Sequence, residues 1–356
     1  MPFFRREKEE DEEYEEESLP RTPRAREFKD LISQHKRARK EPAKPWGRRE
    51  RILVLAALFL TVAASIILAV SSRGWKLPGL PRLKLPSLSF FKEETIIIEK
   101  DKERAKNKEK SEKIIKEFEE ETRKAAGVYG LYVVNLESGF SFGVYEDEEF
   151  TPASLNKLPV MLAMYMEAEK GNLNLETKYS LKATDKRGGS GSLYQKPQGF
   201  VLTYRDMVRY MGKESDNTAF NIASGILGRE KIEGVIKEIG MTDTRVSGED
   251  QKITPYDVGL LFKKLWEGSL VSKKSADEIL EYLTGTIYEN WLVAGIPKEV
   301  KVAHKYGREL HVVNDAGIVF GERPYIVVIL SKKVVEREAD DTFPILSKIV
   351  YQGETL

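Results

Sequence analysis

The chain has 356 residues, with 58 Lys and Arg against 57 Asp and Glu, so its formal net charge is only +1. It has no cysteine, which excludes a disulfide framework, a thiol nucleophile and a thiolate metal site. Acidic and basic residues are intermixed over the C-terminal two thirds, a pattern typical of a solvated surface, so no nucleic-acid partner is expected.

The N-terminal segment separates its charges into blocks. Residues 7–17 are acidic, and residues 21–51 are rich in Lys and Arg. Because residues 1–50 have no periodic apolar pattern, we expect a disordered, charged, cytoplasmic tail there. Its basic stretch has the composition that binds anionic lipid headgroups.

An uncharged run extends from Ile52 to Val70, interrupted only by Thr61 and Ser65. Nineteen residues at about 1.5 Å each nearly cross the roughly 30 Å hydrocarbon core, which predicts one transmembrane helix over residues 51–72. A buried core helix is an alternative, but the run has no amphipathic stripe. A cleaved signal peptide is another, although its apolar region normally has about 7–15 residues.

Basic residues crowd the N-terminal side of this run, and fewer, at Arg73 and Lys76, follow it. This asymmetry predicts a single-pass protein of the cell membrane, with lipid as a partner, the N-terminus cytoplasmic and the C-terminal domain outside. Residues 73–98 repeat proline at Pro78, Pro81 and Pro86, which is typical of an extended linker. One domain, residues 99–356, should follow.

Within this domain the apolar pattern changes from helical to strand-like and back. Residues 102–124 carry apolar side chains on one helical face, so this helix should pack on a sheet. Residues 128–135 and 140–145 predict a β-hairpin. A mainly helical region, residues 154–283, precedes strands at 300–305, 316–320 and 325–330 and a final helix at 341–350. Strands at both ends of a helical region predict an α+β domain with one antiparallel sheet and an inserted helical lobe.

Three short motifs occur in order: S-x-x-K at Ser154–Lys157, S-D-N at Ser215–Asn217 and K-Y-G at Lys305–Gly307. Ser154 should lie at a helix N-terminus, where unpaired amides stabilise developing negative charge, so its own N–H is a natural oxyanion donor. Lys157 falls on the same helical face, within reach of the hydroxyl. The motifs therefore predict a serine nucleophile beside a lysine base.

A lysine acts as a base only when burial or nearby positive charge lowers its pKa from about 10.4. Lys305 is a candidate for that charge and for attracting a substrate carboxylate. The missing side chain of Gly307 lets a ligand approach the strand. Asp216 is expected to cap the helix that follows, and His304 is expected to be a packed residue.

The set of S-x-x-K, S-D-N and K-T-G is the signature of class A β-lactamases and penicillin-binding proteins. The chain resembles this family of serine hydrolases over roughly residues 105–352. Further matching segments are residues 151–159, 188–192, 214–219, 302–305 and 314–319. The resemblance implies a β-lactamase/DD-peptidase-like fold, with the active site between the sheet and the helical lobe.

The resemblance also implies roles for individual residues. Ser215 would relay a proton to the leaving nitrogen, and Asn217 would hold the substrate amide. The N–H of Arg308 would be the second oxyanion donor. The loop of residues 188–192 would lie beside the site.

Two departures from the family pattern bear on activity. Tyr306 replaces the usual threonine, whose hydroxyl helps to anchor the substrate carboxylate. The interval between Thr244 and Pro255 is short, where class A enzymes have a long loop with a deacylating glutamate; Glu249 and Asp250 are the acids available there.

The sequence thus predicts acylation of Ser154 by β-lactams, which are cyclic amides, followed by hydrolysis. Two alternatives remain: a D-Ala-D-Ala peptidase acting on peptidoglycan stem peptides, and a non-catalytic cell-wall-sensing module. No metal site or cofactor is predicted, because the chain has neither metal-ligand spacing nor a phosphate-binding or dinucleotide motif.

Overall fold

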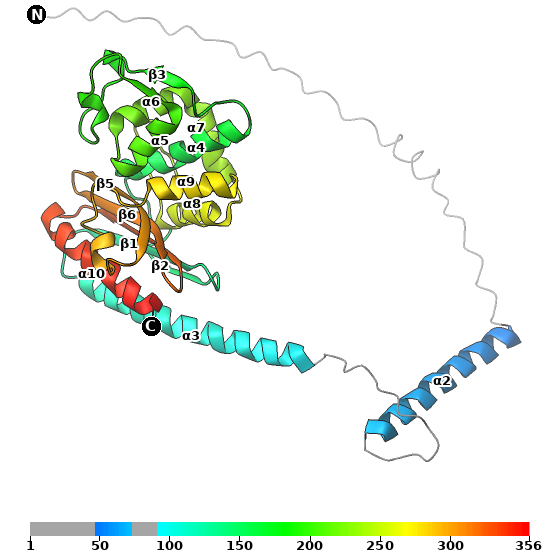
Figure 1. Ribbon diagram of the computed structural model, residues 1–356. Coiled ribbons are helices and arrows are strands. Elements are labelled where there is room, and N and C mark those ends of the chain that lie inside the picture. The colour runs from blue at the N-terminus through cyan, green and yellow to red at the C-terminus, as the bar shows by residue number, and fades with distance from the viewer. Residues whose placement is uncertain (1–46, 73–90, 356) are drawn as a thin grey trace, which may run out of the picture. The chain divides into compact units, whose positions relative to one another are not determined.

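The computed structural model describes residues 47–72 and 91–355 (Figure 1). The chain divides into two units, Met1–Pro86 and Ser87–Leu356. Most of the predicted tail and linker lies outside the described residues.

The first unit contains one described helix, α2, Arg48–Ser72. It coincides with the predicted transmembrane segment, and its described apolar side chains from Ile52 to Val62 are exposed. No helix in the described ranges, however, combines the length and apolarity needed to cross a membrane.

The second unit is built on a five-stranded antiparallel sheet in the order β2-β1-β7-β6-β5. The strands are β1 Val128–Asn135, β2 Ser141–Val144, β5 Lys301–Glu309, β6 Val312–Phe320 and β7 Tyr325–Lys332. The predicted β1–β2 hairpin and the antiparallel sheet are confirmed.

The β5–β6 hairpin is longer than its apolar pattern indicated. Its strands continue to a turn at Leu310 and His311. Asn314 and Asp315 at the start of β6 are fully buried although they are polar. Buried polar residues interrupt the apolar alternation on which strand prediction depends, so the start predicted for this strand, residue 316, lies four residues too late.

Helices cover both faces of the sheet. α8, Pro255–Glu267, packs on β1 and β7, whereas α10, Glu336–Thr355, and α3, Phe91–Thr122, cover the opposite face. Ile114 and Phe118 of α3 are buried there, as the predicted helical face requires. α3 begins at Phe91, inside the segment predicted as linker.

The helical lobe lies between β2 and β5 in the sequence (Figure 1). It contains α4 Lys157–Glu169, α5 Tyr204–Lys213, α6 Asn217–Leu227, α7 Arg229–Ile239 and α9 Lys273–Tyr282, with a small unpredicted sheet of β3 Lys178–Ser180 and β4 Val201–Thr203. Short 3₁₀ turns are η1 Ala153–Asn156, η2 Ala183–Asp185, η3 Leu193–Gln195 and η4 Val293–Gly295.

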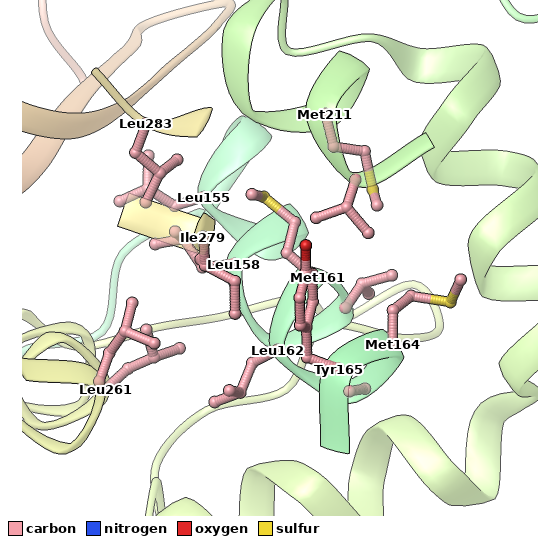
Figure 2. Packing of buried hydrophobic residues seen from close by; sticks show 14 of the residues in the cluster. Leu155, Leu158, Met161, Leu162, Met164, Tyr165, Met211, Leu261, Ile279 and Leu283 are labelled. Carbon is pink, nitrogen blue, oxygen red and sulfur yellow. The ribbon is translucent and has the colours of Figure 1, made fainter. Parts of the chain in front are cut away.

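α4 is the central helix of this lobe. Its first eleven residues, Lys157 to Glu167, are buried, and its apolar side chains pack with Met211, Leu261 and Ile279 from three other helices (Figure 2). A charged group at the start of a helix that is buried on all sides is poorly hydrated. Lys157 therefore begins its helix in a desolvated position.

Candidate active site

Ser154 lies in the 3₁₀ turn η1, directly before α4. The predicted helix start is thus a 3₁₀ turn followed by an α-helix at Lys157. Pro159 explains the difference, because it has no N–H to form the α-helical hydrogen bond with the carbonyl of Leu155. Ala153, just before the serine, has φ +46°, a backbone conformation that is strained for a residue other than glycine.

Asn314 of β6 holds the segment that leads into Ser154. Its Nδ2 donates to the carbonyls of Thr151 (2.8 Å) and Pro152 (3.3 Å), while its Oδ1 accepts from the N–H of Ser331 (2.9 Å). This tether between sheet and nucleophile loop was not predicted. Its signal was only that Asn314 stands in a segment resembling the family.

Lys157 joins Ser154 to Asn217. Its Nζ donates to Oγ of Ser154 (2.8 Å) and to Oδ1 of Asn217 (2.9 Å), and lies 5.3 Å from the ring centre of Phe220. The side chain is 2% exposed, whereas Ser154 is half-buried. The predicted pairing of Ser154 with Lys157 is confirmed, and residues 60 positions apart meet at one ammonium.

Burial lowers the pKa of Lys157 to about 8, because the buried ammonium loses hydration. The carboxylates of Asp216 and Glu309 oppose this shift. The hypothesis that Lys305 depresses this pKa is therefore not supported, and desolvation takes its place. At pH 7 about one tenth of Lys157 is neutral, enough for a general base.

Ser215 and Asp216 form the loop before α6. Asp216 caps α6, as predicted, since its Oδ1 accepts from the N–H of Ala219 (2.8 Å); its Oδ2 accepts from the N–H of Leu193 (2.8 Å). Ser215 is 1% exposed and has φ +53°. Its Oγ has no hydrogen-bond partner among the described residues. A buried hydroxyl without a partner is unusual and available for a proton transfer.

The loop of residues 188–192 packs against this segment, as predicted. Asn217 donates from Nδ2 to the carbonyl of Gly188 (2.9 Å) and from its backbone N–H to the carbonyl of Ser190 (3.1 Å). Gly191 has φ +84°, and a Cβ there would lie 2.1 Å from Oδ2 of Asp216. Only glycine fits this position.

Gly307 brings β5 close to the nucleophile. A Cβ at this position would lie 2.7 Å from the backbone nitrogen of Ser154. The space beside Gly307, where a ligand was predicted to approach, is thus occupied by the protein's own backbone. The backbone nitrogen of Ser154 therefore lies beside Gly307, and Arg308 is the next residue on β5.

The N–H of Arg308 faces the open edge of the sheet. β5 is the edge strand, and the N–H of His304 points away from β6 to the carbonyl of Leu283 (2.8 Å). Backbone groups alternate in direction along a strand, so the N–H groups of residues 304, 306 and 308 point the same way. The role of Arg308 as an oxyanion donor stays a prediction.

Lys305 was predicted to attract a substrate carboxylate, but its ammonium is not exposed to the site. Its side chain is 0% exposed, and Nζ donates to the carbonyl of Tyr306 (2.7 Å) while lying 4.2 Å from that ring. Burial and the charge of Lys157 hold its pKa well below the ordinary lysine value. His304 is fully buried against Asp315, as a packed residue should be.

The two acids proposed for deacylation lie on the exposed side of their loop. Asp250 is 89% exposed and lies 4.0 Å from Arg245. Glu249 is exposed and, within the described part of the chain, forms neither a hydrogen bond nor an ion pair. Gln251 instead contacts the nucleophile turn, since its Oε1 accepts from Nδ2 of Asn156 (3.1 Å). Across residues 47–72 and 91–355, no cluster of three His, Asp or Glu is placed to hold a metal ion.

Comparisons with known proteins identify the family. The model of the β-lactamase enzyme family matches residues 110–353. β-Lactamase VEB-1 of Pseudomonas aeruginosa is 25% identical over 245 residues, which cover 62% of this chain and 81% of that protein.

Solved structures share the fold. A β-lactamase from Sphaerobacter thermophilus aligns with a TM-score of 0.65 at 24% identity, covering 68% of this chain and 97% of its own. PBP-A aligns with a TM-score of 0.63 at 25% identity and the same coverage. A PBP-A variant solved as an acyl-enzyme complex with penicillin G aligns with a TM-score of 0.64 at 26% identity, covering 68% of this chain and 96% of its own. The chain belongs to the β-lactamase enzyme family and is a serine hydrolase of that type.

Proposed function

We propose that Ser154 is acylated by β-lactams and related amides. The observation that carries this proposal is the 2.8 Å contact between Nζ of Lys157 and Oγ of Ser154, in a setting that lowers the pKa of this lysine to about 8. A nucleophile within hydrogen-bond reach of a desolvated amine is the arrangement that activates a serine without histidine. The likeness to a PBP-A acyl-enzyme also supports it.

In the proposed reaction, neutral Lys157 takes the proton from Oγ of Ser154 as Oγ bonds to the amide carbonyl carbon. The N–H groups of Ser154 and Arg308 stabilise the negative oxygen. The carbon–nitrogen bond then breaks, its electron pair stays on nitrogen, and the proton passes from Lys157 through the hydroxyl of Ser215 to that nitrogen. Asn217 orients Lys157 and the substrate amide.

We further propose that the acyl-enzyme is long-lived. Glu249 and Asp250 are both exposed, and the residue of their loop that is hydrogen-bonded to η1 is Gln251, an amide that cannot act as a base. Slow deacylation favours a site of the penicillin-binding type over an efficient β-lactamase, with a peptidase acting on peptidoglycan stem peptides as the second candidate.

An intact-mass time course of the full chain with excess benzylpenicillin tests these proposals. We expect an adduct of the mass of the drug that persists after free drug is removed, and no adduct on Ser154→Ala. An adduct on Ser154→Ala refutes acylation at this serine, and rapid clearance would show a working β-lactamase. Release of D-alanine from a model stem peptide would identify the peptidase.

Membrane attachment is a separate proposal that rests on the sequence alone, from the apolar run Ile52–Val70 and its basic N-terminal flank. Fractionation of cells producing the full chain tests it. Recovery in the membrane fraction, with the C-terminal domain cleaved by protease added outside, supports the proposed orientation. Recovery without membranes refutes the anchor.

A further inference from the structure

The two cations on either side of Gly307 are engaged by the protein itself. Nζ of Lys305 donates to the carbonyl of Tyr306, and the side chain is fully buried. The guanidinium of Arg308 forms two hydrogen bonds with Asp340, at 3.0 and 3.1 Å, and lies 5.8 Å from the ring of Trp291. A ligand carboxylate could form an ion pair with Lys305 or Arg308 only by breaking the hydrogen bonds that this residue already makes.

Tyr306 is locked in place by an aromatic cluster, which we define as Tyr288, Trp291 and Tyr306. Its ring lies 5.4 Å from that of Tyr288 and 6.4 Å from that of Trp291, and those two rings lie 4.6 Å apart. Tyr306 is 9% exposed, and Tyr288 is half-buried. Packing of this kind holds a ring against displacement, so a buried aromatic ring stands at the position where the hydroxyl of the family's threonine would anchor a carboxylate.

Negative charge near the site also disfavours a ligand carboxylate. Glu309 follows Gly307 by two positions on β5 and is exposed, and its carboxylate acts electrostatically on Lys157. Asp216 also acts electrostatically on this lysine. The charge that protonated Lys157 would offer an anionic group is therefore offset by two carboxylates, while Lys305 and Arg308 are already engaged.

We propose that the β5 side of the site accepts a neutral, apolar or aromatic group at the position where penicillins carry their carboxylate. The substrates are then cyclic amides in which this carboxyl is absent or masked as an ester or amide. This inference rests on the proposed acylation of Ser154 and specifies its substrate class. It also counts against a peptidase that requires a free C-terminal carboxylate.

The test compares benzylpenicillin with its methyl ester on the full chain. Adduct formation is followed by intact mass, and each rate is divided by the rate at which hydroxide opens the same compound, which removes the difference in intrinsic reactivity. We expect the corrected rate to be about tenfold higher for the ester, the size of effect that one unfavourably placed charge produces. A faster reaction with the acid overturns the inference and leaves acylation of Ser154 standing. If neither compound forms an adduct, the proposed function fails and the inference fails with it.

Two variants, each with a matched control, test whether Tyr306 and Glu309 cause the expected preference for the ester. Tyr306→Thr should shift the ester-to-acid ratio about tenfold toward the acid, whereas Tyr306→Phe, which keeps the ring, should leave it unchanged. Because Tyr306→Thr removes buried packing, Glu309→Gln provides an exposed alternative that should shift the ratio toward the acid about twofold. Glu299→Gln, also exposed, is its control. A ratio that stays the same in both Tyr306→Thr and Glu309→Gln overturns the inference.

Discussion

A Cβ on Gly307 would lie 2.7 Å from the backbone nitrogen of Ser154, closer than two such atoms approach without movement. Alanine at this position should push η1 away from β5 and misplace the nucleophile and its N–H. We expect Gly307→Ala to lower the acylation rate by about 10²-fold, as a displacement near 1 Å can, and to reduce the free energy of unfolding by about 1–3 kcal/mol.

The matched control is Gly234→Ala in α7, where an added Cβ meets no atom within 4 Å. It should keep the wild-type acylation rate and raise helix stability slightly. Equal acylation rates for the two variants would mean that the close approach of β5 to Ser154 has no role in catalysis.

The pH dependence of acylation should follow Lys157. Its pKa is lowered to about 8 and the neutral amine is the active form, so the rate should fall about tenfold for each pH unit below 8 and level off above it. Stopped-flow or intact-mass rates between pH 5.5 and about 9.5 measure this. A rate that still rises about tenfold per pH unit up to about pH 9.5 would mean that the pKa stays near the ordinary lysine value of 10.5 and that burial does not activate this amine.

Ser215→Ala should separate catalysis from stability. The buried Oγ has no partner in the described residues, so removing it should leave the free energy of unfolding unchanged or raise it by about 1 kcal/mol. Acylation should fall about 10²-fold because proton transfer to the leaving nitrogen is lost. Urea unfolding and adduct formation on the same preparation test both halves; a clear loss of stability would point to a structural hydroxyl.

Gln251→Glu should shorten the lifetime of the acyl-enzyme. The carboxylate can still accept the hydrogen bond from Asn156 and places a base beside the nucleophile turn, so deacylation should accelerate about 10²-fold. Washout of free drug followed by intact mass gives the lifetime. Glu249→Gln and Asp250→Asn should leave it unaltered, and a longer lifetime in either would restore that residue as the natural base.

Asp315→Asn should destabilise the domain. Oδ1 of Asp315 lies 2.8 Å from Nδ1 of His304, and its Oδ2 accepts from the N–H of Leu292 (3.1 Å), all without exposure to water. Replacing a buried carboxylate that is hydrogen-bonded to two partners by an amide leaves one of those partners poorly paired, which costs about 1–3 kcal/mol. Denaturant unfolding measures it, with the exposed Asp250→Asn expected to stay within about 0.5 kcal/mol of wild type. A similar result for both would mean that the buried contacts of Asp315 do not stabilise the domain.

Much of the fold was predictable because the patterns that specify helices, hairpins and caps involve residues close together in the sequence. The β1–β2 hairpin, the apolar face of α3 at Ile114 and Phe118, and the cap of α6 by Asp216 each depend on residues a few positions apart. The start of β6 was missed because Asn314 and Asp315 are buried by partners from distant segments, Thr151 and His304.

The sequence by itself determined the family, the order of the three motifs and the pairing of Ser154 with Lys157, since three residues along one helical turn bring these side chains together. Only the tertiary structure decided that Lys305 is buried and hydrogen-bonded to the carbonyl of Tyr306. It also decided that Asn314 is hydrogen-bonded to the segment before Ser154, and that Gln251 rather than Glu249 is hydrogen-bonded to the nucleophile turn. The reason is physical: burial, electrostatic environment and hydrogen-bond partners are set by segments that meet in space, and spacing along a chain carries no record of them.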